Sequence, residues 1–541
     1  MLFILYKAKG GKDLSQENLN KRFNWGLMMI LVTVFQLLTS TVTIVRNGEI
    51  NVKLLGVFVA YIALEWVYFI IASAFCGQNN FELEIIGFTF SGIGMTICAS
   101  VYDDYAVKQL LSIILGLAVF VVMLCVLRRT DIVMYLRMPV AAAALGLLAL
   151  NLVMAEYVNG ALNWITIKGI SIQPSEIVKL AFIFVGAASL DKLQSTKSLT
   201  KYLIFSFVCV GALFLMRDFG TALIFFFTFI IIAFMRSGDL RTIALVCVAA
   251  ALGAIMIIYF RPTVAARFST YRHIWEQIND KGMQQTRTLI YSASGGLFGL
   301  GIGDGKLKDV FASTTDLVFG MVCEEWGMII AFTIVLAFVF ILLYAIKVAR
   351  TTRSAFYAIA ACAAAGLILF QAGLNIFGVT DILPLTGVTL PFISRGGSSM
   401  ICSWGLLAFI KSADIRTYPK LSKTILPDHP LYPPDVRIGR RTQRTQKKNF
   451  SVPQIVGDPI IPDNVRTASQ APAPQKAKIQ RTTAPKAAPR NTTAQRTARS
   501  ADIPVSKPKT QQKTAAASAR RSAPKDIPIS RKSSSKRRTP R

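Results

Sequence analysis

Long apolar segments follow one another through the first three quarters of this 541-residue chain. About twelve of them reach or approach the roughly 20 residues that an α-helix needs to cross the hydrocarbon core of a bilayer. Because lipid offers the backbone no hydrogen-bond partner, such segments must be helical. The sequence therefore predicts an all-α, polytopic membrane protein, with spans near 25–46, 54–76, 85–101, 106–127, 139–156, 175–190, 202–216, 220–235, 242–260, 317–346, 355–376 and 396–411.

Composition agrees with this class and limits the alternatives. A mean hydropathy of +0.48 with 53% hydrophobic residues excludes an ordinary soluble protein. The net charge of +31 is concentrated in residues 416–541, which are rich in Pro, Ala, Thr, Ser, Lys and Arg. This segment is expected to be a disordered cytoplasmic tail that attracts anionic lipids or a cytoplasmic partner. No nucleic-acid partner is expected, because the tail lacks interleaved aromatic residues for base stacking.

The eight cysteines and two histidines give no sign of a metal site or a disulfide framework. The cysteines are scattered through apolar segments or lie at their ends, and none forms a CxxC pair or a Cys/His cluster. The sequence therefore predicts no dedicated metal-binding residues.

Basic residues in alternate connections orient the spans. They include Arg128, Lys192, Arg236 and Lys347. Both termini are therefore expected to be cytoplasmic. The connections expected outside are 157–174, 261–315 and 377–395. The expected domains are a leader with an additional hairpin at 1–80, a core at 81–415 and the tail at 416–541.

The stretch from Phe311 to Gly327 places acids where a membrane segment begins. Asp316 ends a polar run, and Glu324 and Glu325 follow about two helical turns deeper. An acid at the mouth of a membrane segment is costly unless water, a partner or a function keeps it there. The hypothesis is that Asp316 lies at the outer face and acts as a base. The alternative is a helix N-cap, in which its carboxylate accepts backbone N–H groups.

Further polar clusters fall at the same expected outer face. They contain Asn163 and Trp164, Glu176 and Lys179, Asp218, and Ser398 and Ser399. Glu176 and Lys179 are three residues apart, so on a helix they share a face where an ion pair would neutralise both. Each cluster alone is explained equally well as a structural cap or a buried pair. Together they predict a polar cavity that opens outward.

The connection 261–315 is the longest of the outward segments. It begins with a basic and aromatic stretch, including Arg267, of a pattern typical of an interfacial helix. It closes with the glycine-rich run GLGIGDG at 299–305. That run is a poor dinucleotide fingerprint, because no strand precedes it. We expect flexible backbone that re-enters the membrane surface.

Four motifs occur in an order that resembles the FtsW/RodA/SpoVE (SEDS) family, namely GALNWITIKGISIQPSEIVKLA, RDFGTALI, TTDLVFGMVCEEWG and LPLTGVTLPFISRGGSS. Members of this family are multispanning bacterial membrane proteins that polymerise peptidoglycan glycan strands from lipid II. The resemblance runs from about Phe81 to Asp414, so the first two spans and the tail lie outside it. It implies a peptidoglycan glycosyltransferase of the bacterial cytoplasmic (inner) membrane, serving division or elongation.

The resemblance also implies roles for particular residues. Asp316 matches the family's essential aspartate and is the expected catalytic residue. The expected substrate-binding residues are Trp164, Glu176, Lys179, Asp218, Arg267, Glu324, Ser398 and Ser399. The chain departs from the family pattern with Asn163 for Arg, Met216-Arg217 for Gln-Pro, Leu317 for Phe and Arg395 for Tyr. The neutral Asn163 removes an expected contact to pyrophosphate, and Arg217 or Arg395 is a hypothetical substitute.

The implied reaction is glycosyl transfer between two lipid-linked disaccharides. Asp316 would accept the proton of the acceptor 4-hydroxyl as it attacks the anomeric carbon of the donor. The leaving lipid pyrophosphate would be stabilised by Lys179, by arginines of 261–272 or by a divalent cation. Without dedicated ligands, Mg²⁺ or Mn²⁺ would be held mainly through the substrate pyrophosphate.

The implied partners are lipid II, a class B penicillin-binding protein transpeptidase and other divisome or elongasome membrane proteins. Three alternatives to glycosyl transfer stay open. The first is a lipid II flippase or transporter, which would place acids at the membrane midplane. The others are an inactive membrane scaffold of a cell-wall synthesis complex and an unrelated carrier of polar solutes.

Overall fold

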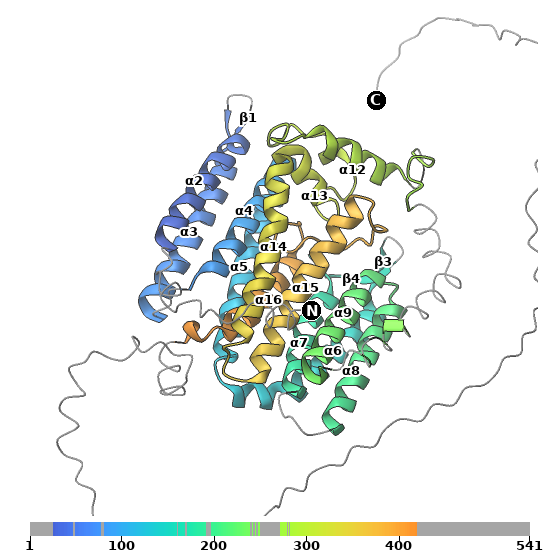
Figure 1. The fold of residues 1–541 in the computed structure, drawn as a ribbon. Coiled ribbons are helices and arrows are strands. Elements are labelled where there is room, and N and C mark those ends of the chain that lie inside the picture. Colours follow the sequence, from blue (N-terminus) through green and yellow to red (C-terminus); the bar gives the residue numbers. More distant parts are fainter. Residues whose placement is uncertain are drawn as a thin grey trace, which may run out of the picture. The chain divides into compact units, whose positions relative to one another are not determined.

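Helices make up most of the described chain (Figure 1). In the computed structural model the described residues are 25–46, 49–76, 80–158, 161–167, 170–190, 196–238, 271–278 and 282–418, with a few single residues between 241 and 280. They belong to one compact unit, residues 1–449. Arg267, most of the predicted span 242–260 and the tail from 419 onward lie outside the described residues.

The helices follow the predicted apolar segments, except α12, which lies within the predicted connection 261–315. Their bounds are α2 Trp25–Ile44, α3 Val52–Cys76, α4 Glu82–Val101, α5 Asp103–Val126, α6 Thr130–Met154, α7 Pro174–Leu190, α8 Thr196–Leu215, α9 Phe219–Ser237, α12 Met283–Ser294, α13 Val318–Met321, α14 Gly327–Ala349, α15 Ala355–Val379 and α16 Gly397–Ala413. In the described ranges, eight helical segments are long and apolar enough to cross a membrane. The prediction of a polytopic helical membrane protein is therefore confirmed.

Two further features of the fold were not predicted. The segment 317–346 is not one continuous α-helix, because a π-helix at Val322–Trp326 separates α13 from α14. Short antiparallel strands also form in two connections. They are β1 Val45–Arg46 with β2 Glu49–Ile50, and the three-stranded sheet of β3 Glu156–Val158, β4 Ala161–Ile167 and β5 Ile170–Ile172. The β-branched run of β4 and β5 pairs Ile165 with Ile172, as expected for residues that fit a pleated surface.

The centre of the bundle is formed by α15 and α16, which pack against each other and against α7. The side chain of Trp404 on α16 is fully buried, and its ring lies 4.7 Å from that of Phe88 and 5.7 Å from that of Phe120. Glycines make room for it. A Cβ atom at Gly116 of α5 would lie only 2.8 Å from the indole ring. Small residues at such contacts let membrane helices approach closely.

The additional N-terminal hairpin, α2 with α3, packs beside α4 and α5 (Figure 1). Within the hairpin, Gln36 Nε2 donates to Glu65 Oε1 at 2.8 Å. The Tyr61 hydroxyl donates to the Phe88 carbonyl of α4 at 2.5 Å. Hydrogen bonds between helices satisfy polar groups that lipid would leave unpaired. The hairpin is therefore joined to the core by polar as well as apolar contacts.

A cluster of charges closes the end of the bundle where α16 ends and α4 begins. Lys411 and Glu84 form an ion pair of 2.7 Å with both side chains fully buried. Asp414 accepts hydrogen bonds from Arg416 Nη2 at 2.7 Å and from the Tyr344 hydroxyl at 2.7 Å. Asn80 Nδ2 also donates to Asp414 at 2.9 Å. Removing one partner from a buried set of this kind leaves an uncompensated charge, so the cluster ties these helix ends together.

Asp414 makes the stability of this end depend on pH. Burial alone would raise its pKa, but the hydrogen bonds and charge of Arg416 outweigh burial and lower the pKa to about 2. The resulting stabilisation is present above the unfolded-state pKa of about 4 and is lost as the pH falls through about 2. We expect the free energy of unfolding in detergent micelles to fall by roughly 2 kcal/mol between pH 5 and pH 2 through this group.

Asp414→Asn tests this expectation, because it removes the titrating group but keeps the shape of the side chain. Its unfolding free energy should change less between pH 5 and pH 2 than that of the parent protein. Asp131→Asn, at the exposed first turn of α6, is the control for removing one carboxyl group. An identical pH profile for the parent and Asp414→Asn would contradict the assignment.

Candidate active site

The π-helix places a break inside a membrane segment, and a glycine-rich loop fills it. The carbonyls of Glu324 and Glu325 accept the amides of Leu300 at 2.9 Å and Gly301 at 3.2 Å. After the break, the Met328 amide donates to the Gly296 carbonyl at 3.0 Å. Backbone groups freed by a helix break in a membrane must find such partners. The run expected to be flexible is therefore a series of turns bonded to the helix, which corrects that expectation.

Only glycine fits part of this loop. The φ angle of Gly299 is +85°, and a Cβ atom there would lie 2.3 Å from the Glu325 carbonyl oxygen. Gly327, the first residue of α14, has a φ angle of +82° and lies against the same loop. These glycines allow close contact between backbone segments.

Glu324 holds the loop and does not face the polar network described below. Its Oε1 accepts the Lys306 amide at 2.7 Å, and its Oε2 accepts the Leu307 amide at 2.9 Å. The residue is fully buried. With both oxygens engaged by backbone amides, Glu324 has a structural position, and its predicted role in substrate binding gains no support from the geometry.

Asp316 lies in the turn before α13 and is half-buried. Its backbone carbonyl accepts Asn375 Nδ2 of α15 at 2.8 Å, and the same amide group donates to the Val388 carbonyl at 2.7 Å. A Cβ atom at Gly387 would lie 3.5 Å from Asp316 Oδ2, so the carboxylate faces the loop 380–396. The N-cap position of α13 is occupied by Leu317, so capping by Asp316 is not the arrangement observed.

The loop 380–396 is bonded directly to the stretch that carries Asp316. The Arg395 amide donates to the Thr314 carbonyl at 2.8 Å, and the Ser394 hydroxyl donates to the Thr315 carbonyl at 2.6 Å. The Leu390 amide in turn donates to Ser394 Oγ at 2.7 Å. Two motifs far apart in the sequence therefore form one end of the bundle, which we call the site end.

Lys179 anchors a buried polar network below this loop. Its Nζ lies 2.7 Å from Glu176 Oε1 and 2.9 Å from Gln371 Oε1, and the side chain is only 1% exposed. Gln371 Nε2 donates to the Thr389 carbonyl at 2.9 Å, and the hydroxyls of Thr389 and Ser399 lie 2.7 Å apart. The predicted Glu176–Lys179 pair is therefore present. Because Lys179 is already neutralised, it is a poor candidate for binding pyrophosphate.

Asp218 organises a second branch of the network. Its Oδ2 accepts Gln173 Nε2 and Asn163 Nδ2, each at 3.2 Å. Its Oδ1 accepts the Thr221 amide at 3.1 Å as the N-cap of α9, so the structural explanation holds for this acid. The Gln173 amide lies 3.4 Å from Ser398 Oγ and links this branch to α16.

Trp164 follows Asn163 in β4 and is half-buried. Successive side chains of a strand point to opposite faces. Since Asn163 faces Asp218, Trp164 lies on the other face of the strand and not in the network. The predicted residues Lys179 and Asp218 thus belong to two polar branches that both reach α16. Trp164 and Glu324 lie apart from these branches.

Comparison with known proteins identifies relatives of this chain. Residues 83–418 match the family model FTSW_RODA_SPOVE, described as cell cycle protein. The chain belongs to the FtsW/RodA/SpoVE family. It is 28% identical over 351 residues to the probable peptidoglycan glycosyltransferase FtsW of Bacillus subtilis, covering 61% of this chain and 85% of that protein. It is 27% identical over 323 residues to the peptidoglycan glycosyltransferase RodA of Mycobacterium leprae, covering 56% and 69%.

A solved structure shares the fold. It is described as the structural coordination of polymerization and crosslinking by a peptidoglycan synthase complex. The TM-score is 0.52 at 24% identity, and the match covers 61% of this chain and 96% of that one. The family match starts at residue 83, so the additional hairpin α2–α3 precedes it.

The network of this FtsW/RodA/SpoVE family member contains residues that sequence reasoning missed. They are Gln371, Asn375 and Thr389. Gln371 and Asn375 lie four residues apart inside the apolar run of α15, so they occupy one face of the helix. Two side-chain amides on one face of a membrane helix are costly without hydrogen-bond partners. That cost could have indicated from the sequence that Gln371 and Asn375 belong to a polar network.

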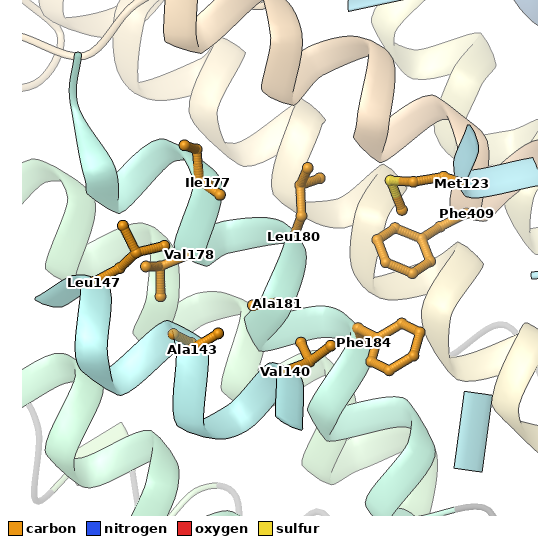
Figure 2. Close-up of a pocket in the computed structure, with 11 residues that line it drawn as sticks. Met123, Val140, Ala143, Leu147, Ile177, Val178, Leu180, Ala181, Phe184 and Phe409 are labelled. Atoms are coloured by element: carbon orange, nitrogen blue, oxygen red, sulfur yellow. The ribbon is translucent and has the colours of Figure 1, made fainter. Parts of the chain in front are cut away.

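An apolar cavity of about 250 Å³ adjoins the network (Figure 2). Ile177 and Val178 of α7 line it directly after Glu176. Apolar side chains of α5, α6, α7 and α16 form its wall: Met123, Val140, Ala143, Ala144, Leu147, Ile177, Val178, Leu180, Ala181, Phe184 and Phe409. In the part of the chain that the structure describes, no three His, Cys, Asp or Glu side chains lie together where they could hold a metal ion.

The position of Glu324 predicts that it acts through stability. Glu324→Gln keeps one acceptor oxygen but turns an NH₂ group toward a backbone amide. We expect its free energy of unfolding in micelles to fall by about 1–3 kcal/mol. Asp304→Asn, in an exposed position of the same loop, is the matched control and should change little. A Glu324→Gln protein as stable as the parent would contradict this structural role.

Proposed function

We propose that this chain is a peptidoglycan glycosyltransferase that polymerises lipid II into glycan strands at the outer face of the bacterial cytoplasmic membrane, in cell division or elongation. The observation that carries the proposal is the position of Asp316. Its carboxylate is half-buried and faces the loop 380–396, which is bonded to the polar network through Thr389. Relatives along the family match bear the name peptidoglycan glycosyltransferase.

In this mechanism Asp316 accepts the proton from the 4-hydroxyl of the acceptor sugar. The hydroxyl oxygen forms a bond to the anomeric carbon of the donor, and the bond from that carbon to the lipid diphosphate breaks. A positioned general base contributes about 10²–10⁴-fold to such a step. Asn375 fixes the backbone of Asp316, so the carboxylate keeps its position during the transfer.

The surroundings match an amphipathic substrate. Hydroxyl and amide groups of Ser398, Thr389 and Gln173 offer hydrogen bonds to sugar hydroxyls at the site end. The apolar cavity beside Ile177 fits a stretch of a lipid chain. Its volume of about 250 Å³ is smaller than a typical site for a whole drug-sized ligand, roughly 300–1,000 Å³, so it would hold only part of a long chain.

The orientation and partners belong to the same proposal. The site end faces outward, and both termini are cytoplasmic, as the basic connections predict. A class B penicillin-binding protein transpeptidase is the proposed main partner, and the fold is shared with a chain from a peptidoglycan synthase complex. A divalent cation, Mg²⁺ or Mn²⁺, would enter with the substrate diphosphate.

A lipid II transporter is the second candidate, and the break at Val322–Trp326 is the observation that favours it. Transporters use discontinuous helices at their substrate sites. Here, however, the glycine-rich loop occupies the break. Parallel assays on one preparation separate the two functions. Labelled lipid II in sealed vesicles reports flipping, and gel analysis of the products reports polymerisation.

Asp316→Asn should retain the fold and lose polymerisation by about 10²-fold or more, because the amide cannot accept the proton. The measurement is glycan polymer formed from labelled lipid II by purified protein, with the transpeptidase present. Asp309→Asn, an exposed acid in the same region, is the matched control and should retain activity. Undiminished polymer from a folded Asp316→Asn protein would refute the base assignment.

A further inference from the structure

Arg395 is held at the site end by contacts that leave its hydrogen-bond donors available. Its backbone amide is bonded to the Thr314 carbonyl at 2.8 Å. Thr314 is two residues from Asp316, which is at most about 7 Å of extended backbone. The guanidinium carbon lies 3.7 Å from the centre of the Tyr105 ring, in the first turn of α5. The residue is half-buried.

Stacking on a ring uses the face of the guanidinium and leaves its edge exposed. The five N–H donors of arginine lie in the plane of the group, in a fork that matches phosphate oxygens. Among the described residues, no side chain or carbonyl accepts a hydrogen bond from these donors, and no carboxylate pairs with the charge. A half-buried cation with unused donors at the rim of a site calls for an anionic ligand.

Two other cations near the site end are already engaged within the described part of the chain. Lys179 is bonded to Glu176, and Lys53 is paired with Asp104. Asn163 is neutral and donates to Asp218. Arg395 also precedes the first turn of α16, whose N-terminus carries a partial positive charge. The local field therefore adds to the attraction of Arg395 for an anion.

We propose that Arg395, oriented by the Tyr105 ring, binds the diphosphate of the lipid-linked donor. The inference rests on the proposed glycosyl transfer. Arg395 stabilises the negative charge that grows on the leaving diphosphate as the bond to the anomeric carbon breaks. Tyr105 is a positioning residue, because it contacts the guanidinium and not the substrate.

Direct binding tests this assignment without turnover. The probe is a fluorescent polyprenyl diphosphate added to the full-length protein in nanodiscs of zwitterionic lipid. Arg395→Gln should raise its dissociation constant by about tenfold or more, the range for a lost charge-assisted hydrogen bond. Arg395→Lys should fall in between, because a lysine keeps the charge but not the planar fork. Tyr105→Leu should weaken binding and Tyr105→Phe should not, because only the ring face is needed.

The matched control is Lys53→Gln, which removes one positive charge from the same end of the bundle. An equal loss of binding in Lys53→Gln and Arg395→Gln would overturn the proposal, since it would show general attraction alone. Unchanged binding in a folded Arg395→Gln protein would also overturn it. So would equal displacement of the probe by phosphatidylglycerol, an anionic lipid without a diphosphate. The unfolding transition of each variant reports whether it is folded.

Failure of the proposed function gives a different pattern. A protein that binds the diphosphate probe through Arg395 but makes no polymer supports this anion site and contradicts the glycosyltransferase proposal. A protein that makes polymer through Asp316, with probe binding unaffected by Arg395→Gln, supports the glycosyltransferase and overturns the Arg395 assignment.

Discussion

Within a bilayer every backbone polar group needs a protein partner, and this constraint shapes the site. The α-helical ladder is interrupted at Val322–Trp326, which frees carbonyls and amides. The glycine-rich loop supplies partners for them, and Glu324 secures the far side of the same loop. The turn that carries Asp316 therefore follows a rigid loop, although it lies outside regular helix.

The same constraint explains why the polar residues form one connected set. Gln371 and Asn375 project from an apolar helix, and they donate to the neighbouring carbonyls of Thr389 and Val388 in the loop 380–396. Lys179 is balanced by Glu176, so a charge deep in the bundle remains tolerable. A substrate at the site end meets hydroxyls and amides whose positions are already fixed, which lowers the cost of ordering them on binding.

The sequence was sufficient to predict most of the helices and the acidic residues near their ends. Eleven of the roughly twelve segments predicted from hydropathy are helical in the structure. They could be predicted because a helix that crosses lipid needs a long and uniform apolar run. The Glu176–Lys179 pair followed from helical spacing. The break at Val322–Trp326 did not, because it depends on backbone partners that lie more than twenty residues earlier. The contacts of Glu324 with the backbone amides of Lys306 and Leu307 were not predictable for a similar reason, since these residues lie 18 and 17 residues earlier in the sequence.

The ring contact between Phe35 and Trp326 gives the N-terminal hairpin a mechanical connection to the core. Their centroids lie 5.8 Å apart, and Trp326 is the last residue of the π-helix that breaks the membrane helix. Membrane helices adjust their tilt to the thickness of the surrounding bilayer. A change in the tilt of α2 would therefore move a ring that contacts the joint between α13 and α14, ten residues after Asp316 in the sequence. Through this contact the thickness of the bilayer would act on the break in the membrane helix. A bundle without the hairpin has no such contact.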